Sequence, residues 1–141
     1  RDLFAPAAAA LSTGAAAPGL GAEVDPASLA RQAGPVVEHR RSADGGHRLR
    51  AEVTWVDRFG NVQLAAGGDV VPLSVGEVTV VPAGGAAHPR VVRRVRTFSD
   101  LSPGEPGLLA DGNGHLALVV REASAADHLG VEAGLLVELT W

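Results

Sequence analysis

The run from His47 to Val56 most constrains the fold, because its side chains alternate between apolar and polar. A period of two is that of a β-strand with one face in a core and the other in water. The face that we expect to be buried consists of Leu49, Ala51, Val53 and Trp55. The opposite face consists of Arg48, Arg50, Glu52 and Thr54. Such a strand needs partners, so the chain must contain a sheet.

Short runs rich in β-branched residues, separated by turn residues, continue this pattern along the chain. The predicted strands are Val36–Arg40, His47–Val56, Asn61–Ala65, Val70–Leu73, Glu77–Val81, Arg90–Phe98, Leu108–Asp111, His115–Arg121 and Leu135–Thr140. The turn Gly112-Asn113-Gly114 is a strong hairpin signal, because a positive φ costs little there. Ala83–Ala87 is predicted to be a loop. This pattern predicts a mainly β fold, an antiparallel, Greek-key-like β-barrel of about eight strands.

Two short segments carry the start and stop signals of helices. Residues 2–13 have Pro6 in the first turn, a run of alanines after it, and Gly14 as a stop. Ser124–Leu129 begins with an N-cap residue and ends before Gly130. We therefore expect a short N-terminal helix and one short helix near the C-terminus.

The composition between the two predicted structural parts indicates a boundary. Residues 14–35 are rich in Ala, Gly and Pro, which is typical of a connecting arm. We therefore expect residues 1–35 to form an interdomain helix and arm, and residues 36–141 to form the barrel domain. The 141 residues include no Met, so we expect the chain to be a fragment of a longer protein.

Composition excludes several classes of function. The net charge of −4 leaves no basic surface for a nucleic-acid backbone. Without Cys there is no disulfide, thiolate nucleophile or Cys-based metal site. The five His are scattered in the sequence, with no pair at helical or tight-turn ligand spacing, which favours ordinary imidazoles over metal ligands. No apolar run approaches the roughly 20 residues of a membrane span.

The first segment with the residue types for ligand binding is Trp55–Asn61. Gly60 allows a sharp turn between two strands, which brings Asp57 near Asn61 and presents Phe59. An Asn amide can match the edge of a purine, and a Phe ring can stack on the base. The alternative is a hairpin whose Asp and Asn cap their own backbone, and the pattern alone favours that alternative.

Two further segments are candidates, each with a plain structural alternative. The backbone of Gly112 and Asn113 can approach a ligand carboxylate closely, although a simple hairpin followed by a capped helix explains the same residues. Phe98 can form a second aromatic wall, although a core Phe at a strand end is commoner. We expect the neighbouring Arg93 and Arg94 to be surface charge. None of these segments forms a catalytic set.

Taken together and in order, the segments resemble motifs of the S-adenosyl-methionine hydroxide adenosyltransferase family, which includes the fluorinases and chlorinases. Arg1–Ala9 resembles its RDxFAPAAA stretch, and Val56–Asn61 resembles its VDxFGN segment. Thr97–Glu105 resembles its TFxD…PGE segment. Gly112–Leu116 and Ala123–Ala126 resemble its SxGYLxIAxxxxxAA run. The ordered matches cover most of the chain.

The resemblance implies a C-terminal domain that holds the adenosyl part of the substrate. Family members are trimers whose ligand lies between the N-terminal domain of one subunit and the C-terminal domain of the next. By motif, Asn61 is expected to bond the adenine edge, and Phe59 and Phe98 to be aromatic walls. The residues expected to offer backbone groups to the base are Val120, Arg121 and Glu122. The residues expected to face the amino-acid end are Asp57, Gly112 and Asn113.

Departures from the family pattern bear on which reaction is expected. Leu64 and Ala65 stand where the family has Thr-Asn, and Gly112 stands where it often has Ser. An Arg typical of halogenases falls closest to Val120, with Arg121 one place on, which slightly favours the hydrolase branch. The departures also leave open a binding or oligomerisation module without a nucleotide role.

The resemblance therefore predicts the C-terminal domain of a cytoplasmic, homotrimeric S-adenosyl-methionine hydrolase that forms adenosine and methionine. A halogenase domain is the nearest alternative. The family's catalytic Asp-Arg-His set belongs to an N-terminal domain that this chain lacks, so no catalytic residue is expected here. We expect S-adenosyl-methionine as the substrate, no cofactor or metal, and no nucleic-acid or membrane partner.

Overall fold

The computed structural model describes residues 2–83 and 88–141, in two compact units that divide between Ala33 and Gly34. The helices are α1 (Phe4–Ser12) and α2 (Ala125–Leu129), with 3₁₀ turns η1 (Ala17–Leu20), η2 (Pro26–Ser28), η3 (Leu73–Val75) and η4 (Phe98–Asp100). The strands are β1 (Val37–Arg41), β2 (His47–Val56), β3 (Val62–Gly67), β4 (Glu77–Pro82), β5 (Arg90–Arg94), β6 (Pro106–Ala110), β7 (His115–Val120) and β8 (Leu136–Thr140). Within the described ranges, no helix is long and apolar enough to cross a membrane.

The first unit is a helix followed by two 3₁₀ turns. The predicted N-terminal helix is confirmed as α1, and the hydroxyl groups of Ser12 and Thr13 close its end by donating to backbone carbonyls. Asp25 caps η2 by accepting from the backbone N–H of Ala27. Neither α1 nor the two turns buries a residue.

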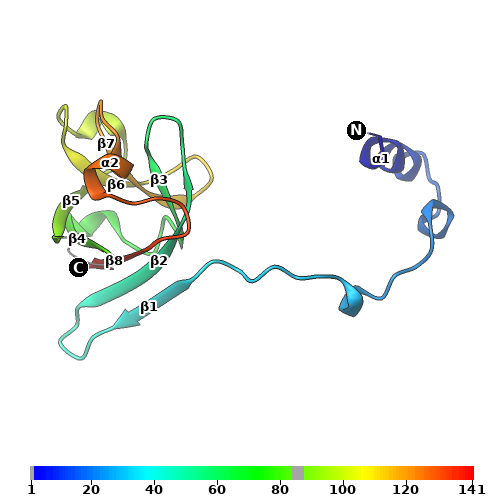
Figure 1. Cartoon of the computed structure of the whole chain (residues 1–141), viewed down its shortest axis with the longest axis horizontal. Coiled ribbons are helices and arrows are strands. Elements are labelled where there is room, and N and C mark those ends of the chain that lie inside the picture. The colour runs from blue at the N-terminus through cyan, green and yellow to red at the C-terminus, as the bar shows by residue number, and fades with distance from the viewer. Residues whose placement is uncertain (1, 84–87) are drawn as a thin grey trace. The chain divides into compact units, whose positions relative to one another are not determined.

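The second unit is a closed β-barrel (Figure 1). Seven strands follow the order β2-β3-β7-β6-β5-β4-β8, and a pairing of β2 with β8 closes the ring. β1 is an additional strand that pairs with β2 outside this ring. The predicted mainly β barrel with two short helices is confirmed, with the difference that β5 and β6 run parallel. The predicted cap of α2 is also confirmed, because Ser124 accepts from the N–H of Asp127 and Gly130 has a left-handed backbone.

The side chains of β2 alternate between core and surface as predicted, except at one end. Leu49, Ala51 and Val53 are buried in the core. Trp55 is 57% exposed, so its predicted burial is wrong. The pairing of β2 with β3 steps by two residues on β2, from Val53 to Trp55, against one on β3. The extra residue, Thr54, is a β-bulge, and a bulge turns the following side chain to the other face.

Two predicted strands differ in the structure. Val70–Leu73 forms a bend that leads into η3 instead of a strand. The predicted strand Arg90–Phe98 ends at Arg94, because Thr97 and Asp100 form a capping box that starts η4. The predicted loop at 83–87 lies outside the described residues except for its first residue.

The side chain of Arg94 helps to explain why residues 70–73 form a bend and not a strand. The prediction that Arg94 lies at the surface is wrong. Its side chain points inward and is only 9% exposed. The guanidinium donates to the carbonyls of Gly68 and Val71 at 2.8 Å each, and to those of Val95 and Leu108. Buried carbonyl oxygens need hydrogen-bond donors, and the planar guanidinium of an Arg offers several N–H donors at once. Arg94 thereby ties the bend at 68–71 to β6.

The histidines are less scattered in space than along the chain. Pairing of β1 with β2 brings His39 Nε2 to 3.0 Å from His47 Nδ1. Both imidazole rings stack on Trp141, which follows β8. Across residues 2–83 and 88–141, no three side chains of metal-ligating type come together.

Candidate functional site

The turn between β2 and β3, residues Asp57–Asn61, is organised by one carboxylate and is called here the first turn. Asp57 Oδ1 accepts from the backbone N–H of Phe59 at 2.8 Å and from that of Asn61 at 2.9 Å. Asp57 Oδ2 accepts from Asn61 Nδ2 at 2.8 Å. Gly60 has a φ of 81°, a conformation that glycine adopts without strain. The predicted self-capping of Asp and Asn therefore occurs, and it fixes the side chain of Asn61.

The turn between β6 and β7, residues Asp111–His115, repeats this design and is called here the second turn. Asp111 Oδ1 accepts from the N–H of Asn113 at 2.8 Å and from that of His115 at 2.9 Å. Gly114 has a φ of 80°. The second carboxylate oxygen of Asp111 accepts from Gln63 Nε2 at 2.6 Å. Gln63 belongs to β3, so this bond links the strand that leaves the first turn to the second turn.

Both carboxylates are held in the ionised form. Partial burial alone raises the pKa of Asp57, but hydrogen bonds from Asn61 and from backbone N–H groups outweigh it and lower that pKa below its ordinary value. The same holds for Asp111, where burial is outweighed by donors from Gln63, His115 and Asn113. At neutral pH each turn therefore contains a negative charge that acts only as an acceptor.

The two turns line one cavity of about 450 Å³, called here the first hollow. The first turn contributes Asp57 and Asn61, and the second contributes Asp111, Gly112 and Asn113. The rest of the lining comes from β2, β3, β6 and β7 and from the segment between β5 and β6. These residues are Trp55, Gln63, Arg96, Thr97, Phe98, Leu109, Ala110, Ala117 and Val119. Cavities of this size are typical of small-molecule sites.

A second cavity of about 660 Å³, the second hollow, shares a boundary with the first. Asp57, Asn61 and Phe98 line both cavities. The remaining lining of the second hollow is Phe59, Val120, Glu122, Ala123 and Ser124. Phe59 is 62% exposed and Phe98 is 43% exposed. Exposed aromatic rings that line a cavity are typical of interaction and ligand-binding surfaces.

The first turn packs tightly on the start of α2. The backbone carbonyl of Gly60 accepts from the N–H of Ala126 at 3.0 Å. A Cβ at Gly60 would collide with the backbone and side chain of Ser124. By contrast, a Cβ at Gly114 would meet nothing within 4 Å. Both turns are therefore held by their own hydrogen bonds and by neighbours, but only the first turn has no room for a side chain at its glycine.

The structure brings together eight of the predicted site residues. Those that line a hollow are Asp57, Phe59, Asn61, Phe98, Gly112, Asn113, Val120 and Glu122. Arg121 lines neither hollow, and its backbone N–H and carbonyl already bond to Glu105 and Gly104. Glu122 has a φ of 61°, the only non-glycine residue of the described part of the chain with a positive φ.

Sequence reasoning missed several residues of the first hollow, most clearly Trp55, Gln63 and Asp111. Strict alternation predicted that Trp55 lies in the core. No residue type in β2 indicates the bulge that turns its side chain outward. Gln63 follows the FGN motif closely, but its bond to Asp111 joins residues far apart in sequence. Asp111 had a detectable signal, since Asp before a Gly-containing hairpin commonly caps the turn.

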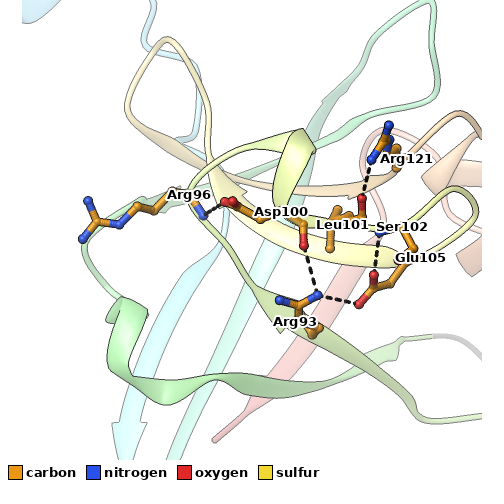
Figure 2. Close-up of polar contacts among 7 residues, drawn as sticks. All are labelled: Arg93, Arg96, Asp100, Leu101, Ser102, Glu105 and Arg121. Atoms are coloured by element: carbon orange, nitrogen blue, oxygen red, sulfur yellow. Dashed lines mark hydrogen bonds and ion pairs between the residues drawn. The ribbon is translucent and has the colours of Figure 1, made fainter.

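Phe98 reaches both hollows from the segment between β5 and β6, residues Val95–Glu105, called here the Phe98 loop. Asp100 Oδ2 accepts from the backbone N–H groups of Arg96 and Thr97, which closes the loop around η4. Figure 2 shows Arg93 of β5 between Asp100 and Glu105, where it donates to the backbone carbonyl of the first and to the carboxylate of the second. Hydrogen bonds lower the pKa of Asp100, the largest from Thr97, so this carboxylate is also ionised.

Comparison with known proteins supplies the family. Residues 51–138 match the model of the SAM hydroxide adenosyltransferase C-terminal domain. The curated (R)-S-adenosyl-L-methionine hydrolase of Salinispora tropica is 41% identical over 141 residues, which is 99% of this chain and 49% of that protein. The hydrolase of the same name from Thermus thermophilus is 33% identical, over 99% of this chain and 47% of that protein. The chain thus spans about half the length of the curated relatives that it matches.

Two solved structures share the fold of this chain. The crystal structure of a conserved hypothetical protein from Thermus thermophilus is 34% identical with a TM-score of 0.69, covering 99% of this chain and 51% of that one. An uncharacterized conserved protein from Thermotoga maritima is 26% identical with a TM-score of 0.74, covering 97% of this chain and 50% of that one. The match of the family model over most of the barrel shows that this chain belongs to the SAM hydroxide adenosyltransferase family and contains the C-terminal domain of that family.

Proposed function

We propose that the intact protein hydrolyses S-adenosyl-methionine to adenosine and methionine, and that this chain holds the adenosyl group. The observation that carries the proposal is the convergence of the two turns on adjoining hollows with exposed aromatic rings. The names of the relatives from Salinispora and Thermus support the reaction. The proposed binding residues are Asp57, Phe59, Asn61, Phe98, Gly112, Asn113, Val120 and Glu122.

Asn61 has the hydrogen-bonding groups that an adenine edge requires. An Asn amide has two N–H donors and one carbonyl oxygen. One donor is used on Asp57 Oδ2, which holds the amide in place. The remaining donor and Oδ1 form a donor–acceptor pair, the set that Asn uses to bind the N6 and N7 edge of adenine. Asp57 therefore orients Asn61 in addition to facing the ligand.

Two aromatic side chains and the backbone of Glu122 complete the proposed adenine site. Phe59 and Phe98 line the second hollow and offer faces on which a purine can stack, an interaction of about 1–3 kcal/mol per base. Within the described ranges, no hydrogen bond uses the backbone N–H or carbonyl of Glu122. Together with its φ of 61°, this favours a role for the Glu122 backbone in ligand binding.

The amino-acid end of the substrate is proposed to lie at the first hollow. The carboxylates of Asp57 and Asp111 provide the negative charge that attracts an ammonium group. Gly112 and Asn113 are exposed at the tip of the second turn, where their backbone can approach a ligand carboxylate closely. Charge and backbone together suit an α-amino acid.

The proposed reaction is an in-line displacement at the ribose 5′ carbon. An oxygen–carbon bond forms from water or hydroxide, and the carbon–sulfur bond breaks with its electron pair leaving on the sulfur of methionine. A proton from the attacking water leaves to solvent or to a base outside this chain. This chain contributes positioning of the adenosyl group, a factor that can account for much of the rate of a displacement. The family's N-terminal domain is the proposed source of the remaining groups.

The proposal includes partners and location. We expect the whole protein to be a cytoplasmic homotrimer in which this domain meets an N-terminal domain. The resemblance supports these expectations, and light scattering with size-exclusion chromatography of the whole protein tests the trimer. A dimer or monomer would contradict it.

Turnover by the whole protein tests the reaction. Incubation with S-adenosyl-methionine in water is expected to give adenosine and methionine in equal amounts, measured by chromatography. Repeating the assay with chloride or fluoride distinguishes the halogenase alternative, because only a halogenase gives a 5′-halo-5′-deoxyadenosine. Absence of adenosine in every condition would refute the proposed hydrolase.

Asn61→Ala distinguishes the proposed site from an inert module. Loss of this contact is expected to weaken adenosine binding by about 1–3 kcal/mol if Asn61 bonds the base. Calorimetry on the whole protein measures the affinity. Unchanged affinity in the variant would favour a module without a nucleotide role.

A further inference from the structure

The Phe98 loop is bound to neighbouring strands at both of its sides (Figure 2). On one side, Arg93 Nη1 of β5 donates to the carbonyl of Asp100 at 3.0 Å and to Glu105 Oε1 at 2.9 Å. Glu105 Oε2 in turn accepts from the backbone N–H of Ser102 at 2.7 Å. These contacts hold the Phe98 loop against β5, the strand that leads into it, so they fix only the local conformation of the loop.

On the other side, Arg121 alone makes three hydrogen bonds to the same loop. Its Nη1 donates to the carbonyl of Leu101 at 2.8 Å. Its backbone carbonyl accepts from the N–H of Gly104 at 2.7 Å, and its backbone N–H donates to the carbonyl of Glu105 at 3.2 Å. Arg121 follows β7 directly, so these bonds join the Phe98 loop to a different part of the barrel.

Arg121 also contacts the other boundary of the second hollow. Its Nε lies 3.4 Å from Glu122 Oε1, and Glu122 lines that hollow together with Phe98. The backbone of Glu122 has its positive φ at this point. Residues held in such a conformation persist only where their surroundings fix them. Arg121 is therefore in contact with both segments that must stay at a set distance for a flat ring to fit between them.

We propose that Arg121 is a positioning residue that sets the separation between Phe98 and the Glu122 segment, and thereby the width of the slot for the adenine ring. This inference rests on the proposed function. Arg121 lines neither hollow, so it acts through the Phe98 loop and not by touching the ligand. The ion pair with Glu122 is largely exposed and contributes little stability, so the expected effect is geometric.

The test compares three variants of the whole protein. Arg121→Met removes the guanidinium that bonds Leu101 and Glu122 and keeps an apolar stem, while the two backbone hydrogen bonds of residue 121 remain in every variant. Arg121→Lys keeps a positive charge and a donor group but lacks the planar fork with which Arg121 contacts Leu101 and Glu122. Arg48→Met is the matched control, because Arg48 is an exposed strand arginine with an ion pair to Glu138 and lines neither hollow. Thermal unfolding checks that each variant is folded. If Arg121→Met does not fold, the comparison of Arg121→Lys with wild type tests the inference.

The kinetic readout separates positioning from chemistry. In Arg121→Met, KM for S-adenosyl-methionine is expected to rise about tenfold, the effect of one lost charged hydrogen bond. The value of kcat is expected to change much less, since Arg121 contacts no reacting atom. Arg121→Lys is expected to lie between wild type and Arg121→Met. Arg48→Met is expected to match wild type.

Fluorine NMR reads the position of the ring directly. Incorporated fluorophenylalanine gives a Phe98 signal that is identified by its loss in Phe98→Leu. In Arg121→Met the Phe98 signal is expected to shift or broaden while the Phe59 signal stays in place. A KM or a Phe98 signal that stays at the Arg48→Met value would overturn the inference. If the wild-type protein forms no adenosine, the proposed function fails, and the Phe98 signal by itself then decides whether Arg121 positions the ring.

Discussion

The first and second turns have the same hydrogen bonds from the backbone to an Asp but different surroundings. In each, an Asp accepts from the backbone N–H groups two and four residues later, and a glycine has a φ near 80°. The first turn is pressed against Ser124 at the start of α2, whereas the second turn is open at Gly114. One local pattern thus lies closely packed against a helix in one place and leaves space at its glycine in another. We expect substitutions to be tolerated at the second glycine and not at the first.

The largest expected effect is that of Gly60→Ala. The new Cβ would collide with Ser124, and the positive φ would add strain. We expect a loss of about 3 kcal/mol in the free energy of unfolding, together with a displaced first turn. Urea denaturation measures the change. A loss no larger than that of the equivalent change at Gly114 would contradict the tight packing of the first turn.

The Asp57→Asn variant tests whether the carboxylate orients Asn61. The new amide would place a donor against the donor of Asn61, so the groups of Asn61 that we propose to bind adenine are expected to turn away. Adenosine affinity is expected to fall about tenfold. The matched change Asp111→Asn disturbs Gln63 instead and is expected to spare adenosine binding. Calorimetry measures both, and equal losses would contradict the division of roles between the turns.

Gly114→Ala is expected to cost only about 1 kcal/mol of stability, because the positive φ is strained but the space is open. Methionine affinity is expected to change with the altered tip, while adenosine affinity stays the same. Thermal unfolding and calorimetry measure the two effects. A loss of adenosine affinity would show that the two turns do not act separately.

The smallest effect is the pH dependence of stability. The folded pKa values of Asp57 and Asp111 lie below the unfolded value of about 3.9, so the stability that they add is present above that value. It is lost as the pH falls through the folded pKa values. The stability difference between wild type and Asp57→Asn is therefore expected to be constant near neutral pH and to shrink below about pH 4. A difference that grows on acidification would contradict ionised carboxylates in the folded state.

Local motifs allowed much of the site to be predicted, and long-range contacts account for the rest. Asp57, Asn61 and Asn113 lie in turns whose chemistry is visible in the sequence. Trp55 could not be placed, because a single bulge at Thr54 reverses the face of the strand after it. Arg94 looked like surface charge, and only the fold shows that carbonyls of the bend at 68–71 need its donors.

The direct test of the central claim is hydrogen–deuterium exchange of the whole protein with adenosine and methionine, the two products of the proposed reaction. Peptides that cover the first turn (57–61) and the second turn (111–115) are both expected to exchange more slowly when the two ligands are present. Peptides from β1 and the β1–β2 hairpin are expected to remain unchanged. Protection of neither turn, or of one turn only, would contradict the account of a single site formed by both.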